Sequence, residues 1–229
     1  MLIQCSRRAR FVAVALASAA ACSSMVPLTA SVASLKPLVV QHSEVTNSFG
    51  SGFKTMAMRP MITSDVTNVV PSIAPITSRL MKGYVTGYFS GFYRPLVVRS
   101  GNSMTIKPGG SIVTSGVSVY RSTTYPGGAI DLATKSRARI LSAFRAPHLT
   151  GVHLDLVSGL GDKALVLVYS LTTPALSPGG TVSKTMSVTF IFSRGRFAAT
   201  VDVTGQGSVS KSQAMALAKR VDDRIAHAG

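Results

Sequence analysis

The clearest pattern of apolar and polar positions lies in the last third of the chain, between Lys163 and His227. Residues 164–171 form a continuous apolar run, and residues 185–192 and 197–203 alternate apolar with polar side chains. Such runs predict β-strands, and the short Ser-Arg-Gly-Arg segment between the last two predicts a β-hairpin. The sequence therefore places three strands in succession near its end.

A helix is expected after this hairpin. Ser210 and Gln213 have the spacing of a capping box, and apolar residues then recur at helical intervals from Ala214 to Ile225. An amphipathic helix packed on the hairpin follows from this pattern.

The rest of the chain predicts further strands with fewer helices between them. Strands are expected over residues 53–59, 82–94, 112–120 and 151–157, a short helix from Leu35, a helix broken by Pro71 and Pro75 over residues 64–80, and a single helix over residues 129–144, opened by Pro126-Gly127-Gly128. Runs of strands with occasional helices indicate an α+β fold with a largely antiparallel β-sheet backed by helices.

The N-terminus resembles an export signal. Arg7, Arg8 and Arg10 precede an apolar run over residues 11–21 that ends in small side chains, as in a signal peptide, and the run is too short to span a bilayer as a helix. Residues 23–34 are small, rich in Ser, Thr and Ala, and without periodicity, so that segment 22–34 suits a flexible tether. We therefore expect a signal peptide at 1–21, the tether, and a single α+β domain over residues 35–229.

Cys22 follows the small residues of the signal directly. The segment Ala19-Ala20-Ala21-Cys22 resembles the lipobox of bacterial lipoproteins, although it lacks the usual leucine three residues before the cysteine. Cys22 is therefore the candidate lipidation site, and ordinary cleavage between Ala21 and Ala33 is the alternative. Cys5 would leave with the signal, so no internal disulfide is expected.

The net charge of the chain indicates which kinds of partner it could bind. The chain carries 24 basic and 8 acidic side chains, a net charge of +16. Loss of Arg7, Arg8 and Arg10 with a signal peptide leaves 21 basic against 8 acidic, or +13. Such an excess favours an anionic membrane or cell-wall surface, and a protein partner is also possible. No specific nucleic-acid partner is expected, and a general scarcity of acids explains the charge equally well.

Two groups of side chains are candidates for ligand binding. Tyr84, Tyr88 and Phe92 recur at intervals of four with glycines between them, and could form a stacking surface, although filling the core is the simpler role. Arg194 and Arg196 at the predicted hairpin tip could bind an anion together, although a solubilising turn is the simpler reading.

No motif indicates catalysis, a metal site or a cofactor. The four histidines share no close spacing, and paired carboxylates are scarce. Ser51-Gly52-Phe53-Lys54 matches a serine-x-x-lysine nucleophile only in letters, since glycines flank it where a long helix should begin. We expect no cofactor, and the sequence favours a protein that is not an enzyme.

Gly161-Asp162-Lys163-Ala164 before an apolar strand, then the hairpin with its arginine-glycine turn, then the helix from Ala214 to Ile225, resembles small exported proteins of actinobacterial type. These include lipoproteins and extracellular sensor domains of mycobacterial receptor kinases. The resemblance covers residues 150–228 and implies an antiparallel sheet backed by helices, with a surface or sensory role. The chain departs from the kinase sensor domains in lacking their paired disulfides.

The function expected from the sequence is an exported, lipid-anchored cell-surface protein with a non-catalytic binding or sensor-like role. Two alternatives remain open at this stage. One is a small exported hydrolase, and the other is a carrier of an apolar ligand in a cavity between sheet and helices, for which Phe89, Phe92 and Phe144 are candidate walls.

Overall fold

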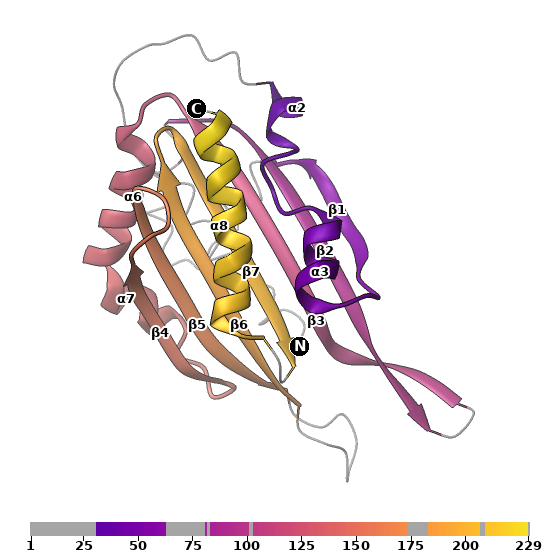
Figure 1. Cartoon of the computed structure of the whole chain (residues 1–229). Coiled ribbons are helices and arrows are strands. Elements are labelled where there is room, and N and C mark those ends of the chain that lie inside the picture. The colour runs from indigo at the N-terminus through magenta and orange to yellow at the C-terminus, as the bar shows by residue number, and fades with distance from the viewer. Residues whose placement is uncertain are drawn as a thin grey trace.

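The computed structural model describes residues 31–62, 81, 83–100, 103–173, 183–206 and 209–228. One antiparallel sheet organises them (Figure 1), with seven strands in the order β1-β2-β3-β7-β6-β5-β4. The strands are β1 (Lys54–Pro60), β2 (Tyr84–Ser100), β3 (Ser103–Tyr120), β4 (Leu149–Val157), β5 (Lys163–Thr173), β6 (Ser183–Arg194) and β7 (Phe197–Gln206). The α+β class, the antiparallel sheet and the closing hairpin β6–β7 are confirmed.

Helices cover both faces of this sheet. The final helix α8 (Lys211–Ala228) lies across β6 and β7, and α2 (Val32–Leu35) and α3 (His42–Phe49) lie beside it on the same face, which we call the α8 face. The helices α6 (Thr124–Lys135) and α7 (Arg137–Ala143) pack against β4, β5 and β6 from the opposite face, the α6 face.

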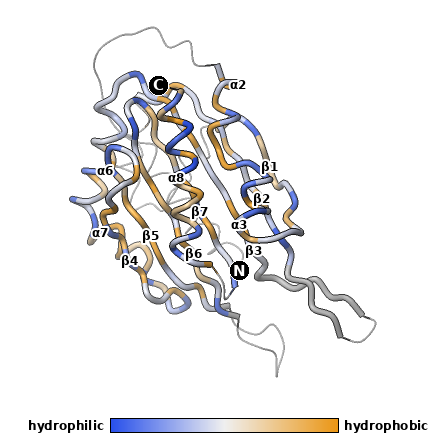
Figure 2. The backbone as a smooth tube through the Cα atoms, in the orientation of Figure 1, coloured by the Kyte–Doolittle hydropathy of each residue, from blue (hydrophilic) through white to orange (hydrophobic). Residues whose placement is uncertain are grey.

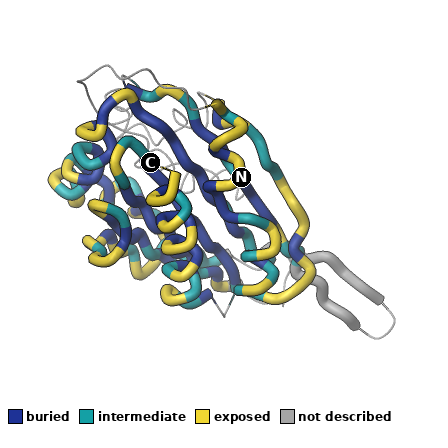
Figure 3. Tube along the Cα trace, turned by 45° about the horizontal axis from the view of Figure 1, so that its top comes forward, coloured by how far each residue is buried: buried dark blue, intermediate teal, exposed yellow. Residues whose placement is uncertain are grey.

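Alternation along the strands divides the interior into two cores. Ala164 and Val166 of β5 point to the α8 face, whereas Leu165 and Leu167 point to the α6 face. All four are buried, because helices lie on both sides of β5. This explains why residues 164–171 read as a continuous apolar run rather than an alternating one. Figure 3 shows the central strands as the buried layer, with exposed residues on the outer sides of the helices.

The predicted helix over residues 129–144 is wrong as a single element. It begins earlier, at Thr124, with Pro126 inside its first turn, where the missing proline N–H costs no helical hydrogen bond. It also breaks at Ser136, whose φ of −96° and ψ of 14° end α6 and start α7. The break lets α6 contact β5 and β6 while α7 contacts β4.

The structure at both ends of the described chain largely matches what the sequence predicts. Ser210 and Gln213 form the expected capping box before α8, since Gln213 N donates to Ser210 Oγ (3.1 Å) and Ser210 N donates to Gln213 Oε1 (3.3 Å). In Figure 2, α8 alternates between hydrophobic and hydrophilic colour, as an amphipathic helix should. At the other end, α2 begins at Val32, inside the expected tether, because Ser31 caps it.

Two sequence predictions lie outside the described residues: the broken helix over 64–80, and the signal peptide with Cys22. Of the helices that are described, none has both the length and the apolar character needed to cross a membrane.

Candidate functional site

The three aromatic residues predicted to act together do not share one surface. Tyr88 and Phe92 are buried in the core of the α8 face, where the Phe92 ring lies 5.6 Å from that of His42. Tyr84 joins the other core, edge-on to Tyr120 at 6.2 Å. The register of β2 on β3 shifts between Tyr84 and Thr86, and this bulge moves Tyr84 out of phase. The structure gives these rings packing roles, and ligand binding by them stays a prediction.

The aromatic residues of the other parity form a partly exposed surface. Phe89 and Tyr93 of β2 point to the α6 face, away from the core that holds Tyr88 and Phe92. On the edge strand β1, Lys54 pairs with Tyr93 and Arg59 pairs with Phe89. Met56, in the β1 bulge, reaches over Gly91, close to the position that a Cβ would occupy there. We call Lys54, Met56, Arg59, Phe89 and Tyr93 the aromatic strip.

Exposure and charge set the aromatic strip apart from the core. Tyr93 is 37% exposed and Met56 is 50% exposed. The Arg59 guanidinium lies 5.6 Å from the centre of the Phe89 ring, a cation–π arrangement. Neither β1 nor β2 contains an aspartate or glutamate. The strip therefore combines apolar rings with positive charge.

A cluster of hydroxyl groups lies on the same face, toward the centre of the sheet. The Asp202 carboxylate of β7 accepts hydrogen bonds from Ser187 Oγ (2.9 Å), Thr189 Oγ1 (2.7 Å) and Thr204 Oγ1 (3.3 Å). All four side chains are buried. Hydrogen bonds to a carboxylate are stronger than those between neutral groups, so they fix the four side chains against one another.

The sheet register connects the hydroxyl cluster to the aromatic strip. Gly91 pairs with Thr114, Thr114 pairs with Asp202, and Asp202 pairs with Thr189. A continuous row thus crosses the sheet from its β1 edge to the buried carboxylate. The hydroxyl cluster was not predicted, although the alternation of Ser187 and Thr189 with apolar residues in β6 was visible in the sequence.

Arg194 at the hairpin tip forms an ion pair with Asp222 inside the fold. Its Nη2 donates to Asp222 Oδ2 at 2.7 Å, and Asp222, which is 4% exposed, also accepts from Gly161 N at 2.8 Å. Burial acts to raise the pKa of Asp222, but the hydrogen bonds from Arg194 and Gly161 outweigh burial and lower the pKa. The hydrogen bond to Asp222 likewise raises the pKa of Arg194 despite the opposing effect of burial. The pair joins α8 to two turns of the sheet.

Arg196 is placed differently from Arg194. It lies in the two-residue turn after Arg194, half-buried, and its carbonyl oxygen accepts from Tyr120 N at 2.9 Å. The two guanidiniums therefore do not form a joint anion site of the expected kind, because Asp222 holds one of them. Anion binding by Arg196 alone stays a prediction.

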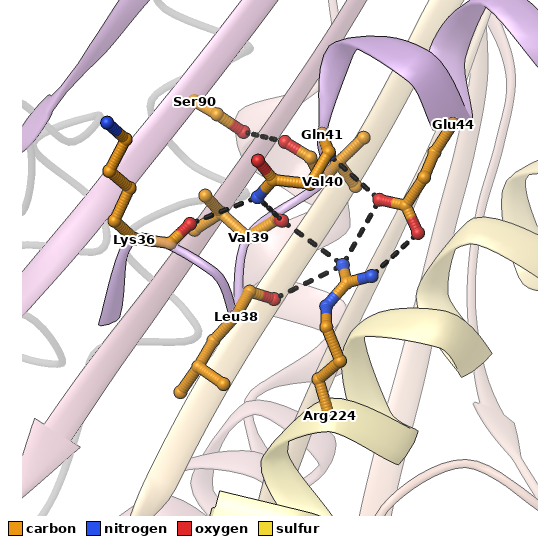
Figure 4. Close-up of polar contacts among 8 residues, drawn as sticks. All are labelled: Lys36, Leu38, Val39, Val40, Gln41, Glu44, Ser90 and Arg224. Carbon is orange, nitrogen blue, oxygen red and sulfur yellow. Dashed lines mark hydrogen bonds and ion pairs between the residues drawn. The ribbon is translucent and has the colours of Figure 1, made fainter. Parts of the chain in front are cut away.

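A second internal clamp joins α8 to the N-terminal segment (Figure 4). Arg224 Nη1 donates to Glu44 Oε1 at 2.6 Å, and Arg224 Nη2 donates to Val39 O at 3.1 Å. Glu44 also accepts from Gln41 N at 2.8 Å, which completes the capping box of α3. Ser90 Oγ of β2 donates to Val40 O at 2.9 Å, so the same segment is held to the sheet.

Described residues line a groove and a smaller hollow. A wide, shallow groove of about 490 Å³ lies between the end of α7 and β4, lined by Leu141, Phe144, Arg145, Ala146, Pro147, Leu149 and Val152. A smaller one of about 140 Å³ lies near the start of α8, where Arg94 stacks on Phe53 at 4.9 Å and donates to Phe49 O. Both have mixed polar and apolar walls.

The apolar-carrier alternative meets a geometric obstacle. Phe92 lies in the core of the α8 face and Phe144 in the core of the α6 face, both almost fully buried. Two residues on opposite sides of a sheet cannot line one cavity. Within the described residues, no three His, Cys, Asp or Glu side chains gather where they could hold a metal ion.

Comparison with known proteins adds one structural likeness. No family model and no curated protein matches the sequence. The chain is similar to the extracellular domain of PknH from Mycobacterium tuberculosis, with 12% identity, a TM-score of 0.46, and coverage of 89% of this chain and 100% of that one. This likeness is too low to carry an argument about function.

Proposed function

We propose that this chain is an exported cell-surface protein with a non-catalytic binding or sensor-like role toward an anionic component of the cell envelope. The distribution of its charges supports the proposal most directly. Export and anchoring are supported by the N-terminal sequence pattern.

Most of the described acidic side chains are occupied within the fold. Four described acids form ion pairs: Glu44 with Arg224, Asp131 with Lys163, Asp155 with Arg137, and Asp222 with Arg194. Asp202 is buried among hydroxyls, and Asp162 accepts from Gly195 N at 2.7 Å. Asp223 is exposed on α8. The acids thus neutralise cations that already hold the fold together.

Ten further described cations face solvent. Within the described residues, the following exposed side chains have no acidic partner: Lys36, Lys54, Arg121, Lys135, Arg139, Arg145, Lys184, Lys211, Lys219 and Arg220. A surface of one dominant sign attracts anionic polymers and headgroups over roughly the Debye length, about 8 Å at physiological salt. This surplus favours an anionic partner over a neutral one.

Binding to anionic surfaces can be tested by co-sedimentation. The protein should sediment with phosphatidylglycerol-containing vesicles or with wall polymers, but not with phosphatidylcholine vesicles. Raising sodium chloride from about 50 mM to about 500 mM should release it, because screening shortens the reach of exposed charges. Equal binding to neutral and anionic vesicles, or no binding to any anionic material, would refute the proposal.

We include a lipid anchor on Cys22 in the proposal. In a bacterial host, radiolabelled palmitate should enter the wild-type protein and should be lost in Cys22→Ala. Cys5→Ala is the matched control, since Cys5 lies in the segment expected to be removed. Labelling that persists in Cys22→Ala would exclude the anchor and leave secretion as the mode of export.

A further inference from the structure

We infer that the smaller hollow, between the end of α3 and the start of α8, binds a small aliphatic monocarboxylate. The carboxylate pairs with Arg94 of β2, and the short apolar chain lies against the valines of the sheet. We call this space the Arg94 hollow. The inference goes beyond the proposed function, which concerns the exposed cations of the surface.

The walls of the Arg94 hollow come from parts of the chain that meet only in the folded protein. Arg94 of β2 pairs with Ser111 of β3, and both line the hollow. Gln213 Nε2 of α8 donates to Ser48 O of α3 at 3.1 Å, so the two helix ends are tied together over the sheet. The hollow is therefore bounded by three strands and by two helices that a hydrogen bond holds in place.

Arg94 supplies the positive charge of the hollow. Its Nη1 donates to Phe49 O at 2.7 Å, and its guanidinium lies 4.9 Å from the centre of the Phe53 ring, so its plane is held in position. Within the described part of the chain, Nε and Nη2 donate no hydrogen bond, and Arg94 forms no ion pair. A carboxylate can accept two parallel hydrogen bonds from such a pair of nitrogens.

No acid of the described chain competes for this guanidinium. None of the described residues that line the hollow is acidic. Glu44, the acid of α3, is held by Arg224 and by Gln41 N. The Asp202 side chain is buried among hydroxyls on the α6 face. A ligand carboxylate therefore supplies a counter-charge that the fold does not.

The volume and the apolar walls limit the size of the ligand. Phe49, Val113, Val203 and Val209 line the hollow beside Arg94, and the space measures about 140 Å³. A cavity of about 150 Å³ holds a benzene molecule. A carboxylate with a short aliphatic chain, such as butanoate or pentanoate, fills a space of this size, whereas a long-chain fatty acid does not.

Isothermal titration calorimetry of the exported protein tests the ligand class. Pentanoate should bind saturably below about 10 mM, a range that suits so small a ligand. Pentanamide, which has the same shape without the charge, should bind at least about tenfold more weakly, because a charged group forms the stronger hydrogen bonds. Decanoate should bind no more tightly than pentanoate. Absence of saturable pentanoate binding, or an affinity that rises steadily with chain length, would overturn the inference.

Replacing the cation tests the role of Arg94. Arg94→Gln should weaken pentanoate binding at least about tenfold and leave pentanamide binding unchanged. Arg121→Gln is the matched control, because Arg121 is exposed, does not line the hollow and has no acidic partner among the described residues. It should bind pentanoate as the wild type does. Equal weakening by the two substitutions would assign the effect to net charge and overturn the site.

Filling the hollow tests the site without changing its charge. Ser111→Leu places an apolar side chain in the space and leaves the hydrogen bond from Arg94 to Phe49 O intact. Pentanoate binding should be lost, while thermal melts show a folded protein. Because Arg94 also holds the end of α3, this variant decides the question if Arg94→Gln does not fold. Normal pentanoate binding in Ser111→Leu would overturn the inference.

The two proposals can fail separately. Sedimentation with anionic vesicles or wall polymers without pentanoate binding would overturn the Arg94 site and leave the anionic partner of the surface intact. Pentanoate binding without sedimentation would support the Arg94 site and refute the proposed function.

Discussion

Gly161 is the residue at which the turn between β4 and β5 meets the end of β6. Its φ is +57°, and a Cβ there would collide with the carbonyl oxygen of Ser193, which also accepts from Asp162 N at 2.6 Å. Gly161→Ala should therefore lower the free energy of unfolding by about 3 kcal/mol, from backbone strain and a clash that only backbone movement can relieve.

Gly159→Ala is the control for Gly161→Ala in urea denaturation. Gly159 also has a positive φ, +73°, but open space surrounds the position of its Cβ. Its substitution should cost only the conformational strain, about 1 kcal/mol. Equal losses for the two variants would mean that the contact with Ser193 does not matter.

The ionisation of Asp222 makes the stability of the fold depend on pH. Its folded-state pKa lies below the unfolded value of about 3.9, so the stability it contributes is present above that pH and disappears as pH falls through the folded pKa. Asp222→Asn should lose about 2–3 kcal/mol at pH 7, below the range for fully buried pairs because Arg194 is partly exposed.

Urea denaturation at pH 7 and at about pH 3 measures this effect, because about pH 3 lies below the usual pKa of an aspartate. The difference in stability between wild type and Asp222→Asn should shrink at the lower pH. Asp223→Asn, an exposed neighbour on α8, should change little at either pH. A gap between wild type and Asp222→Asn that widens in acid would contradict the assigned direction of the shift.

The sequence could not show the role of Arg194 because its partner lies in another element. Arg194 and Asp222 are 28 residues apart, and only the packing of α8 on β6 and β7 brings them together. In the sequence, Arg194 and Arg196 looked equivalent. The ion pair distinguishes them, and no local pattern encodes it.

At the scale of elements, the sequence predicted β2 as a strand but did not predict which of its side chains share a face. Glycines in a run of aromatics excluded a helix, and a strand was the correct inference. The interval of four grouped Tyr84 with Tyr88 and Phe92, but the bulge after Tyr84 reversed its side. The glycines of the other parity leave space that larger side chains fill, since Met56 and the Phe89 ring lie over Gly91, and Met61 lies over Gly87.

The clamp between α8 and α3 should govern the local stability of the N-terminal segment. Arg224→Met removes the ion pair with Glu44 and the bond to Val39 O, while keeping a long apolar stem. Amides of α3 should then exchange with deuterium several times faster, since a partly exposed pair of this kind is worth about 1 kcal/mol.

Arg220→Met provides the comparison for that measurement. Arg220 lies one turn earlier on α8 and is exposed, so its loss should leave exchange in α3 unchanged. If both variants accelerate exchange equally, the effect comes from α8 as a whole rather than from the clamp.

At the scale of the whole molecule, local sequence patterns predicted the fold class but not the order of the strands in the sheet. Strands that follow one another in the sequence pair in β1–β2, β2–β3, β4–β5, β5–β6 and β6–β7, the last as predicted. The pairing of β3 with β7 joins the β1–β2–β3 part of the sheet to the β4–β5–β6–β7 part, and it places Val113 opposite Val203. Both strands are apolar on the α8 face, as are several others, so composition alone does not select this pair.

The net charge and the aromatic strip make different predictions for the molecule as a whole. Lys54 lies on the strip at the α6 face, whereas Lys219 is exposed on α8, which covers the opposite face. Replacing either lysine by glutamine changes the net charge by the same amount. If a diffuse positive field alone drove binding, the two variants would weaken it equally.

A localised site predicts an unequal result. In co-sedimentation with phosphatidylglycerol-containing vesicles, Lys54→Gln should weaken binding about fivefold, as expected when one cation near an anionic membrane surface is lost, and Lys219→Gln should have a much smaller effect. Raising the salt should narrow the difference, since both contributions are electrostatic. Equal weakening by the two substitutions would assign the binding to the overall charge, with no preferred face.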